Sequence, residues 1–202
     1  MTPEAFQAAV GVSDQAIGRL KQYLDLLNKW QARINLVGAS TLDDPWRRHL
    51  LDAAQLLPHI PADGGPIVDL GAGAGIPGLI LAACGVTDVH LIESNARKGV
   101  FLREAARLMA VEVTVHTARV EVVTLARPAA AVTARALAPL TDLLGYAIRF
   151  AGPGTRCLFL KGQDVVIELT EARKSWNMSA QLVDSLSDPS GRLVVVEEFA
   201  HV

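Results

Sequence analysis

Residues 69–78 read D-L-G-A-G-A-G-I-P-G and place four glycines within eight positions, directly after the apolar pair Ile67-Val68. Because glycine has no Cβ, such a segment lets the backbone turn sharply and approach a bulky ligand closely. A helix that begins after the glycines offers unpaired N–H groups to the same ligand. The segment therefore indicates a strand–loop–helix turn that holds a nucleotide-like ligand.

Two ligands fit this loop. Residues 73–78 satisfy G-x-G-x-x-G, and Glu93 follows Gly73 by 20 residues, as in a dinucleotide site. In an earlier frame, Asp69-x-Gly71-x-Gly73 resembles the S-adenosylmethionine (SAM) loop of class I methyltransferases. In both frames Glu93 is placed to accept hydrogen bonds from ribose hydroxyls. Asp69 would repel a pyrophosphate but tolerates a sulfonium, and the chain is too short for a separate dehydrogenase substrate domain, so the SAM frame is favoured.

The chain from Pro66 onward alternates strands with helices. The predicted strands are Ile67–Leu70, Val89–Glu93, Glu112–His116, Ala130–Ala134 and Arg156–Lys161, and the predicted helices are Pro77–Cys84, Ala96–Met109, Leu140–Phe150 and Val165–Lys174. Parallel strands need crossover connections, so this pattern predicts an α/β, Rossmann-like fold with helices on both faces of the sheet. Segments Ala180–Leu186 and Leu193–Val196 predict a closing hairpin. We expect a seven-stranded, mostly parallel sheet whose last strand is antiparallel.

The first 60 residues are predicted to be helical. Thr2-Pro3 and Ser13-Asp14 are typical helix starts, and apolar residues recur at three- and four-residue spacing between Asp14 and Arg33. A third helix is expected from about Asp44 to Leu57. We expect residues 1–60 to pack on a core of residues 61–202 as a single domain.

Polar residues stand at the carboxyl ends of the predicted body strands: Asp69, Glu93, the group Arg119-Val120-Glu121, Arg135 and Lys161. In an open α/β sheet these ends share one edge, where ligands bind. We therefore expect Arg135 and Lys161 to face the same crevice as the cofactor.

Composition fits a cytoplasmic enzyme. The chain has 202 residues, 50% of them hydrophobic and only 5% aromatic. The start carries no signal-peptide pattern, the longest apolar stretch is too short for a bilayer, and no metal-ligand spacing is present. A net charge of -2 gives no global argument for nucleic acid, so such a partner must be argued from local basic clusters.

Five further segments are distinctive: Leu27-Asn28-Lys29-Trp30, Arg48-His49-Leu50-Leu51-Asp52, Arg119-Val120-Glu121, Leu160-Lys161-Gly162-Gln163 and Gly191-Arg192-Leu193-Val194-Val195. With them, nearly the whole chain resembles the RsmG (GidB) family of rRNA methyltransferases. The resemblance implies SAM-dependent methylation of guanine N7 in a loop of 16S rRNA of the small ribosomal subunit, with S-adenosylhomocysteine as the product. It also implies cofactor contacts from Gly71, Gly73, Ile76, Val120, Glu121 and Arg135. Ala72 and Ala134 depart from the family, which often has hydroxyl residues there.

Guanine N7 has an in-plane lone pair, so we predict catalysis by positioning, without a general base. Arg135 and Lys161 are the positioning candidates, holding a phosphate or the methionine carboxylate. The RNA-binding candidates are Arg48, Arg97, Lys98, Lys161 and Arg192. His49 and Asp52 are interpreted as a structural hydrogen-bonded pair.

N7 lies in the deep, narrow major groove of A-form RNA, so the target base should be in a loop or extruded. We expect a monomer that binds no membrane and no metal. Two alternatives stay open: a methyltransferase of a small molecule or protein, and a small NAD-binding protein.

Overall fold

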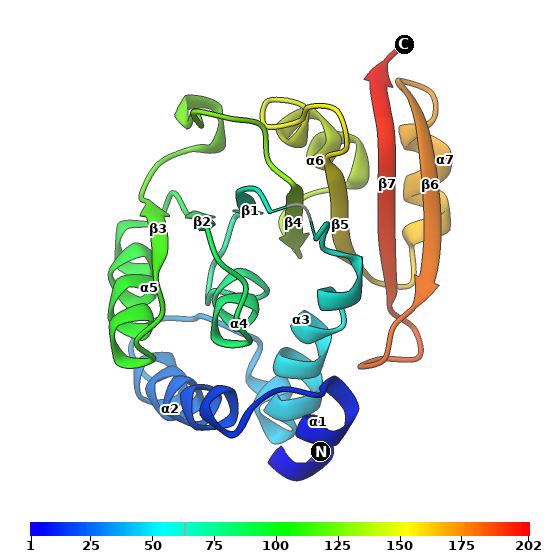
Figure 1. Ribbon diagram of the computed structural model, residues 1–202. Coiled ribbons are helices and arrows are strands. Elements are labelled where there is room, and N and C mark those ends of the chain that lie inside the picture. The colour runs from blue at the N-terminus through cyan, green and yellow to red at the C-terminus, as the bar shows by residue number, and fades with distance from the viewer. Residues whose placement is uncertain (63) are drawn as a thin grey trace.

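One seven-stranded sheet organises the molecule, in the order β3-β2-β1-β4-β5-β7-β6 (Figure 1). The computed structural model describes residues 1–62 and 64–202. The strands are β1 (Ile67–Leu70), β2 (Val89–Ile92), β3 (Val113–His116), β4 (Ala131–Arg135), β5 (Arg156–Lys161), β6 (Trp176–Asp184) and β7 (Arg192–His201). Pairings among β1 to β5 are parallel, whereas β7 runs antiparallel to β5 and β6. The predicted sheet is confirmed.

Side chains that alternate along the strands belong to two hydrophobic clusters, one on each face of the sheet. Ile67, Leu91 and Leu158 belong to one cluster, and their sequence neighbours Val68, Ile92 and Phe159 to the other. The helices that follow the strands cover these faces: α4 (Gly78–Ala83), α5 (Ala96–Leu108), η4 (Val120–Val122), α6 (Leu140–Ala147) and α7 (Val165–Ala172). Since both faces are buried, the central strands β1 and β4 are mostly apolar, as expected of a parallel sheet, with Asp69 and Thr133 as buried polar exceptions.

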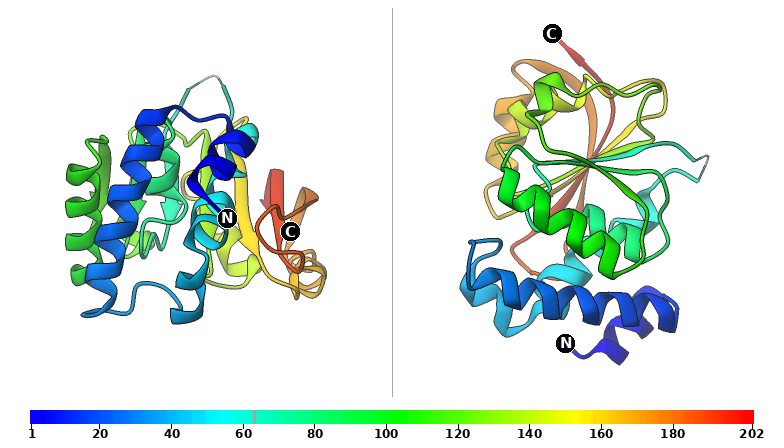
Figure 2. Two further views of the ribbon diagram at one scale, coloured as in Figure 1. Left: turned by 90° about the horizontal axis from the view of Figure 1, so that it is seen from below. Right: turned by 90° about the vertical axis from the view of Figure 1, so that its left-hand side faces the viewer.

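The N-terminal helices join the α4–α5 side of the sheet. They are α1 (Pro3–Val10) and α2 (Asp14–Gln31), whose first turns are capped by the Thr2 and Ser13 side chains as predicted. Figure 2 shows α2 alongside α5. Phe101 of α5 makes edge-on ring contacts with Tyr23 and Trp30 of α2, at centroid distances of 6.3 and 5.7 Å. The first 60 residues thus share a core with α4 and α5.

The predicted helix from Asp44 to Leu57 is wrong in its regularity. After the 3₁₀ turn η1 (Ala39–Asp43), the chain forms a wide π turn η2 (Trp46–Leu51), a short α3 (Asp52–Ala54) and the 3₁₀ turn η3 (Leu57–His59). Pro58 lies in that last turn and cannot donate a backbone hydrogen bond, which ends the helix. Wide turns of this kind cluster at functional sites, and this one carries Arg48 and His49.

The closing hairpin is longer than the predicted strands, because β6 begins at Trp176 and β7 extends to His201. Among residues 1–62 and 64–202, no helix has the length and apolar character needed to cross a membrane.

Candidate functional site

The glycine loop follows β1 and depends on glycine at two positions. Gly71 and Gly75 have φ values of +60° and +82°, in the left-handed region. A Cβ on Gly71 would lie 2.5 Å from the Leu137 side chain, and one on Gly75 would lie 2.4 Å from Leu79. The loop therefore has both a backbone shape and a packing that only glycine satisfies.

Asp69 supports this loop from below instead of facing the crevice. Its side chain is fully buried; Oδ2 accepts a 2.9 Å hydrogen bond from the Gly78 N–H, and Oδ1 accepts one of 2.9 Å from the Thr133 hydroxyl. Burial raises the pKa of Asp69 to about 7, although these two hydrogen bonds lower it. The interpretation of Asp69 as part of the ligand-binding edge is thus corrected: the carboxylate ties the start of α4 to β1 and β4.

Glu93 connects the end of β2 to the same loop. Its Oε2 accepts a 2.9 Å hydrogen bond from the Gly73 N–H, and Oε1 accepts one of 2.7 Å from the Asn95 N–H. The side chain is 7% exposed. Each carboxylate oxygen retains a second acceptor site for a ligand hydroxyl.

Two cavities border the glycine loop. The β2 cavity, of about 250 Å³, is lined by Gly71, Glu93, Lys98, Val120, Glu121 and Ala136 among others. The loop cavity, also about 250 Å³, is lined by His49, Gly71, Gly73, Ile76, Arg135 and Ala136 among others. Gly71, Lys98 and Ala136 line both cavities, which therefore adjoin. All seven residues predicted to contact the cofactor lie in this pair of cavities.

A third space, the hairpin cavity, opens on the other side of Arg135. It measures about 240 Å³ and is lined by Arg48, Asp52, Arg135, Lys161, Asp188 and Arg192 among others. Arg135 and Ala136 line both this cavity and the loop cavity. Ala136 lines all three, with a left-handed φ of +51°.

Arg135 is held between two side chains of the N-terminal segment. Its Nε lies 3.2 Å from Asp52 Oδ2, and its Nη1 lies 3.2 Å from His49 Nδ1. The predicted direct pair of His49 with Asp52 is therefore wrong: among the described contacts, both residues bind Arg135. Because a guanidinium only donates, His49 Nδ1 must accept and Nε2–H donates to Thr41 Oγ1, 2.9 Å away.

His49 is buried, and burial lowers its pKa to about 4, with the positive charges of Arg135 and Arg48 acting in the same direction. The ring is thus neutral at pH 7 and holds Arg135 in place.

Lys161 also has partners. Its ammonium donates to the Ala138 carbonyl at 2.9 Å and forms a 2.6 Å ion pair with Glu168, and the side chain is only 9% exposed. Glu168 Oε2 accepts a further hydrogen bond of 2.7 Å from the Leu140 N–H. These contacts join β5, α6 and α7. Lys161 therefore stabilises the packing of these elements and also lines the hairpin cavity.

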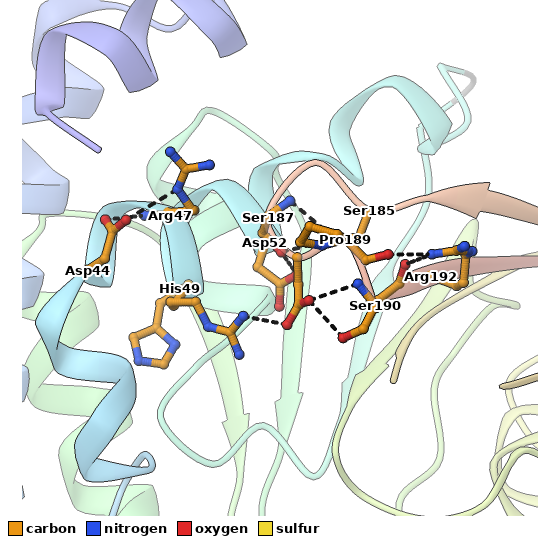
Figure 3. A network of polar contacts seen from close by, with 12 residues as sticks. Asp44, Arg47, His49, Asp52, Ser185, Ser187, Pro189, Ser190 and Arg192 are labelled. Carbon is orange, nitrogen blue, oxygen red and sulfur yellow. Dashed lines mark hydrogen bonds and ion pairs between the residues drawn. The ribbon is translucent and has the colours of Figure 1, made fainter. Parts of the chain in front are cut away.

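The other basic candidates divide into two groups. Arg48 and Arg192 line the hairpin cavity: Arg48 pairs with Asp188, and Arg192 pairs with Asp184 and donates to the Gly191 carbonyl. Figure 3 shows Arg192 beside Pro189, to whose carbonyl it also donates. Arg97 and Lys98 lie in the first turn of α5; Arg97 is exposed, and Lys98 is half-buried between the β2 and loop cavities.

The sequence analysis missed residues whose partners are distant in the chain. Tyr23 of α2 is fully buried, and its hydroxyl donates a 2.8 Å hydrogen bond to the Ala74 carbonyl in the glycine loop. Gln55 and Ser187 bind Asp52 and connect α3 to the β6–β7 turn. Tyr23 interrupts the apolar stripe of α2 with a polar tip, which is the one local signal that it needs a partner.

A glycine loop at the carboxyl edge of this mostly parallel sheet, with an antiparallel β7, defines the chain as a methyltransferase of the class I fold. Two solved structures share that fold: the ribosomal protein L11 methylase from Lactobacillus delbrueckii subsp. bulgaricus (TM-score 0.60, 13% identity, covering 72% of this chain and 76% of that one), and a TehB-like SAM-dependent methyltransferase from Corynebacterium glutamicum (TM-score 0.56, 17% identity, covering 88% of this chain and 98% of that one).

The chain belongs to the rRNA small subunit methyltransferase G (GidB) family, whose pattern it matches over residues 16–192. A relative of that name in Rhodospirillum rubrum is 52% identical over 198 residues, which cover 98% of this chain and 98% of the relative. Another, in Rhodospirillum centenum, is 53% identical over 195 residues, covering 96% of this chain and 90% of the relative. The predicted family and the methyltransferase class are confirmed.

Proposed function

We propose that this protein transfers the methyl group of SAM to N7 of a guanine in 16S rRNA of the small ribosomal subunit. The observation that carries the proposal is the pair of adjoining cavities around the glycine loop, in a chain of the rRNA small subunit methyltransferase G family. The family names of the relatives support rRNA as the substrate. The choice of guanine N7 rests on the family resemblance and on the chemistry of the crevice.

The crevice fits SAM. Glu93 supplies buried acceptor sites for ribose hydroxyls in the β2 cavity, beside Val120 and Glu121 on the adenine side. Gly71, Gly73 and Ile76 leave room for the rest of the molecule along the loop cavity, which Arg135 also lines. When bound, SAM supplies a methyl group activated by the sulfonium.

The side chains around the crevice favour an acceptor that needs no deprotonation. His49 uses both ring nitrogens for hydrogen bonds, and Asp52 is paired with Arg135. Guanine N7 already presents a lone pair, so the protein has only to hold it in line with the methyl group and exclude water. Such positioning contributes at most about 7–11 kcal/mol to lowering a barrier.

The test of the reaction is transfer from isotopically labelled SAM to small subunits from a strain that lacks the protein, with naked 16S rRNA in parallel. After nuclease digestion, mass spectrometry should find the label in N7-methylguanosine. Label in another nucleoside would contradict N7 as the target, and no label despite SAM binding would contradict rRNA as the substrate.

The cofactor site is tested with a matched pair of glycine variants. Gly71→Ala places a Cβ 2.5 Å from Leu137, which lines the β2 cavity, at a left-handed φ of +60°. We expect SAM affinity to fall about tenfold or more, that is ~1.4 kcal/mol. Gly85→Ala carries comparable backbone strain at φ +105° with no atom within 4 Å, and should leave SAM affinity unchanged. Calorimetric titration measures both, and NAD should not bind the wild type.

A further inference from the structure

The hairpin cavity borders the donor crevice, which is the pair of adjoining β2 and loop cavities around the glycine loop. It shares Arg135 and Ala136 with the loop cavity, and its walls come from η2 and α3, the ends of β4 and β5, α7 and the β6–β7 turn. Methyl transfer requires the reacting atoms to approach within about 3–3.5 Å. An acceptor base must therefore lie next to the donor crevice, and the hairpin cavity adjoins that crevice at Arg135 and Ala136.

The charges of the cavity do not suit a phosphate. Its lining includes four cationic side chains and three carboxylates: Arg48, Arg135, Lys161, Arg192, Asp52, Glu168 and Asp188. Three of the cations are paired within the lining, as Arg48 with Asp188, Arg135 with Asp52, and Lys161 with Glu168. A phosphate would face these carboxylates. A guanine edge, with an acceptor at O6 and donors at N1 and N2, is matched by guanidinium donors and carboxylate acceptors together.

One carboxylate oxygen in this cavity has no partner among the described residues. Glu168 Oε2 accepts from Lys161 Nζ and from the Leu140 N–H, whereas no hydrogen bond is made to Oε1. The other two carboxylates, of Asp52 and Asp188, have both oxygens engaged. Because Oε2 is anchored at two points, the position of Oε1 is fixed, and the side chain remains 24% exposed.

We propose, on the basis of the proposed function, that the hairpin cavity binds the acceptor guanine and that Glu168 Oε1 accepts hydrogen bonds from its N1–H and amino group. Arg48 and Arg192, which line the same cavity, supply donors for O6. Adenine presents a lone pair at N1, which the same carboxylate repels. Glu168 is thus a specificity-determining residue, and Lys161 positions it.

The first test is nucleotide binding by the protein saturated with S-adenosylhomocysteine, so that the adenosine site is filled. Guanosine 5′-monophosphate should shift the amide resonances of Gly162 and Gly191, which line the hairpin cavity, and bind about tenfold or more tightly than adenosine 5′-monophosphate. Glu168→Gln keeps a carbonyl oxygen for Leu140 but can replace Oε1 with an amide donor. In this variant the preference for guanosine should fall to about threefold or less, which a merely structural role would not change.

The second test is methyl transfer to small subunits, with a matched control on the same helix. Glu168→Gln should lower kcat/KM for subunits about 10- to 100-fold, as expected for losing hydrogen bonds to a charged acceptor, while SAM affinity stays within about twofold. Glu171 also pairs with a lysine at 2.6 Å but is 64% exposed and lies outside the cavity lining, so Glu171→Gln should behave as the wild type.

Equal binding of the two nucleotides, no shifts at Gly162 and Gly191, or full activity of Glu168→Gln would overturn this assignment even if the wild type methylates N7. Absence of N7 label with the wild-type protein would instead overturn the proposed function, so the two failures are distinguishable.

Discussion

Within residues 1–62 and 64–202, the Tyr23 hydroxyl makes the one hydrogen bond that joins α2 to the glycine loop. It donates to the Ala74 carbonyl from a fully buried position, and burial raises the pKa of Tyr23, so the phenol stays protonated. In Tyr23→Phe the carbonyl loses its donor, which costs about 1–3 kcal/mol. We expect a several-fold weaker affinity for SAM, with kcat little changed, measured by calorimetry and steady-state kinetics.

A control removes a similar bond elsewhere. Thr155 is buried directly before β5; its hydroxyl donates to the Ala129 carbonyl at 2.6 Å and also accepts a 2.9 Å hydrogen bond from the Gly152 N–H. Thr155→Val should lower stability to urea by a comparable amount but leave SAM affinity unchanged. Equal effects of the two variants on SAM binding would show that Tyr23 acts only through global stability.

At the residue scale, the sequence predicts those site residues whose role is set locally. The glycines and Glu93 belong to one β-loop-α-β segment, so their spacing along the chain fixes their spacing in space. Tyr23 and Ala74 are separated by 51 residues, and no local pattern specifies that contact. Asp69 was misplaced for a related reason: its position at a strand end is readable, but the direction of its side chain depends on Gly78 and Thr133.

Gln55, at the end of α3, connects this helix to the β6–β7 turn. The Gln55 amide donates to Asp52 Oδ1 at 3.0 Å and accepts from the Leu186 N–H at 2.9 Å. Gln55→Ala should destabilise the protein by about 1–3 kcal/mol, because the Gln55 side chain is buried and its removal breaks its hydrogen bonds with Asp52 and Leu186. Hydrogen exchange should rise in residues 185–191 and not in α5.

The matched control is Gln181→Ala on exposed β6, where surface substitutions change stability by about 0.5 kcal/mol or less. If hydrogen exchange in residues 185–191 were unchanged in Gln55→Ala, Gln55 would not hold the β6–β7 turn against α3.

At the element scale, strands are predictable from sequence where both faces of the sheet are buried. The five parallel strands are short apolar runs bounded by turns, and β1 and β5 have the predicted bounds. The helix predicted for residues 44–57 is not regular because tertiary contacts determine the conformation of this segment: Arg48 pairs with Asp188, and Asp52 pairs with Arg135. Helical periodicity of the apolar residues continues through that segment, so the pattern cannot distinguish a regular helix from a π turn.

Two buried groups give the whole molecule opposite dependences of stability on pH. The pKa of Asp69 is raised from 3.8 to about 7, so the folded state takes up a proton that the unfolded state releases between these values. Its contribution is therefore present at low pH and is lost as pH rises from about 4 through 7. The pKa of His49 is lowered from 6.5 to about 4, so its contribution is present above pH 6.5 and is lost as pH falls toward 4.

These contributions oppose each other between pH 4 and 6.5, so the wild type should show a shallow dependence there. Asp69→Asn removes the titration of Asp69 and should make the free energy of unfolding rise with pH, with a slope of up to ~1.4 kcal/mol per pH unit. His49→Gln removes the titration of His49 and should make the free energy of unfolding fall over the same range, because the lowered pKa of His116 only partly replaces the lost contribution. The lowered pKa of Asp188, about 2, acts below this range. Urea unfolding at half-unit pH intervals measures both slopes. Slopes of the same sign in the two variants would mean that neither group carries the assigned titration. Opposite signs would show that Asp69, beneath the glycine loop, and His49, beside Arg135, together set the pH dependence of stability.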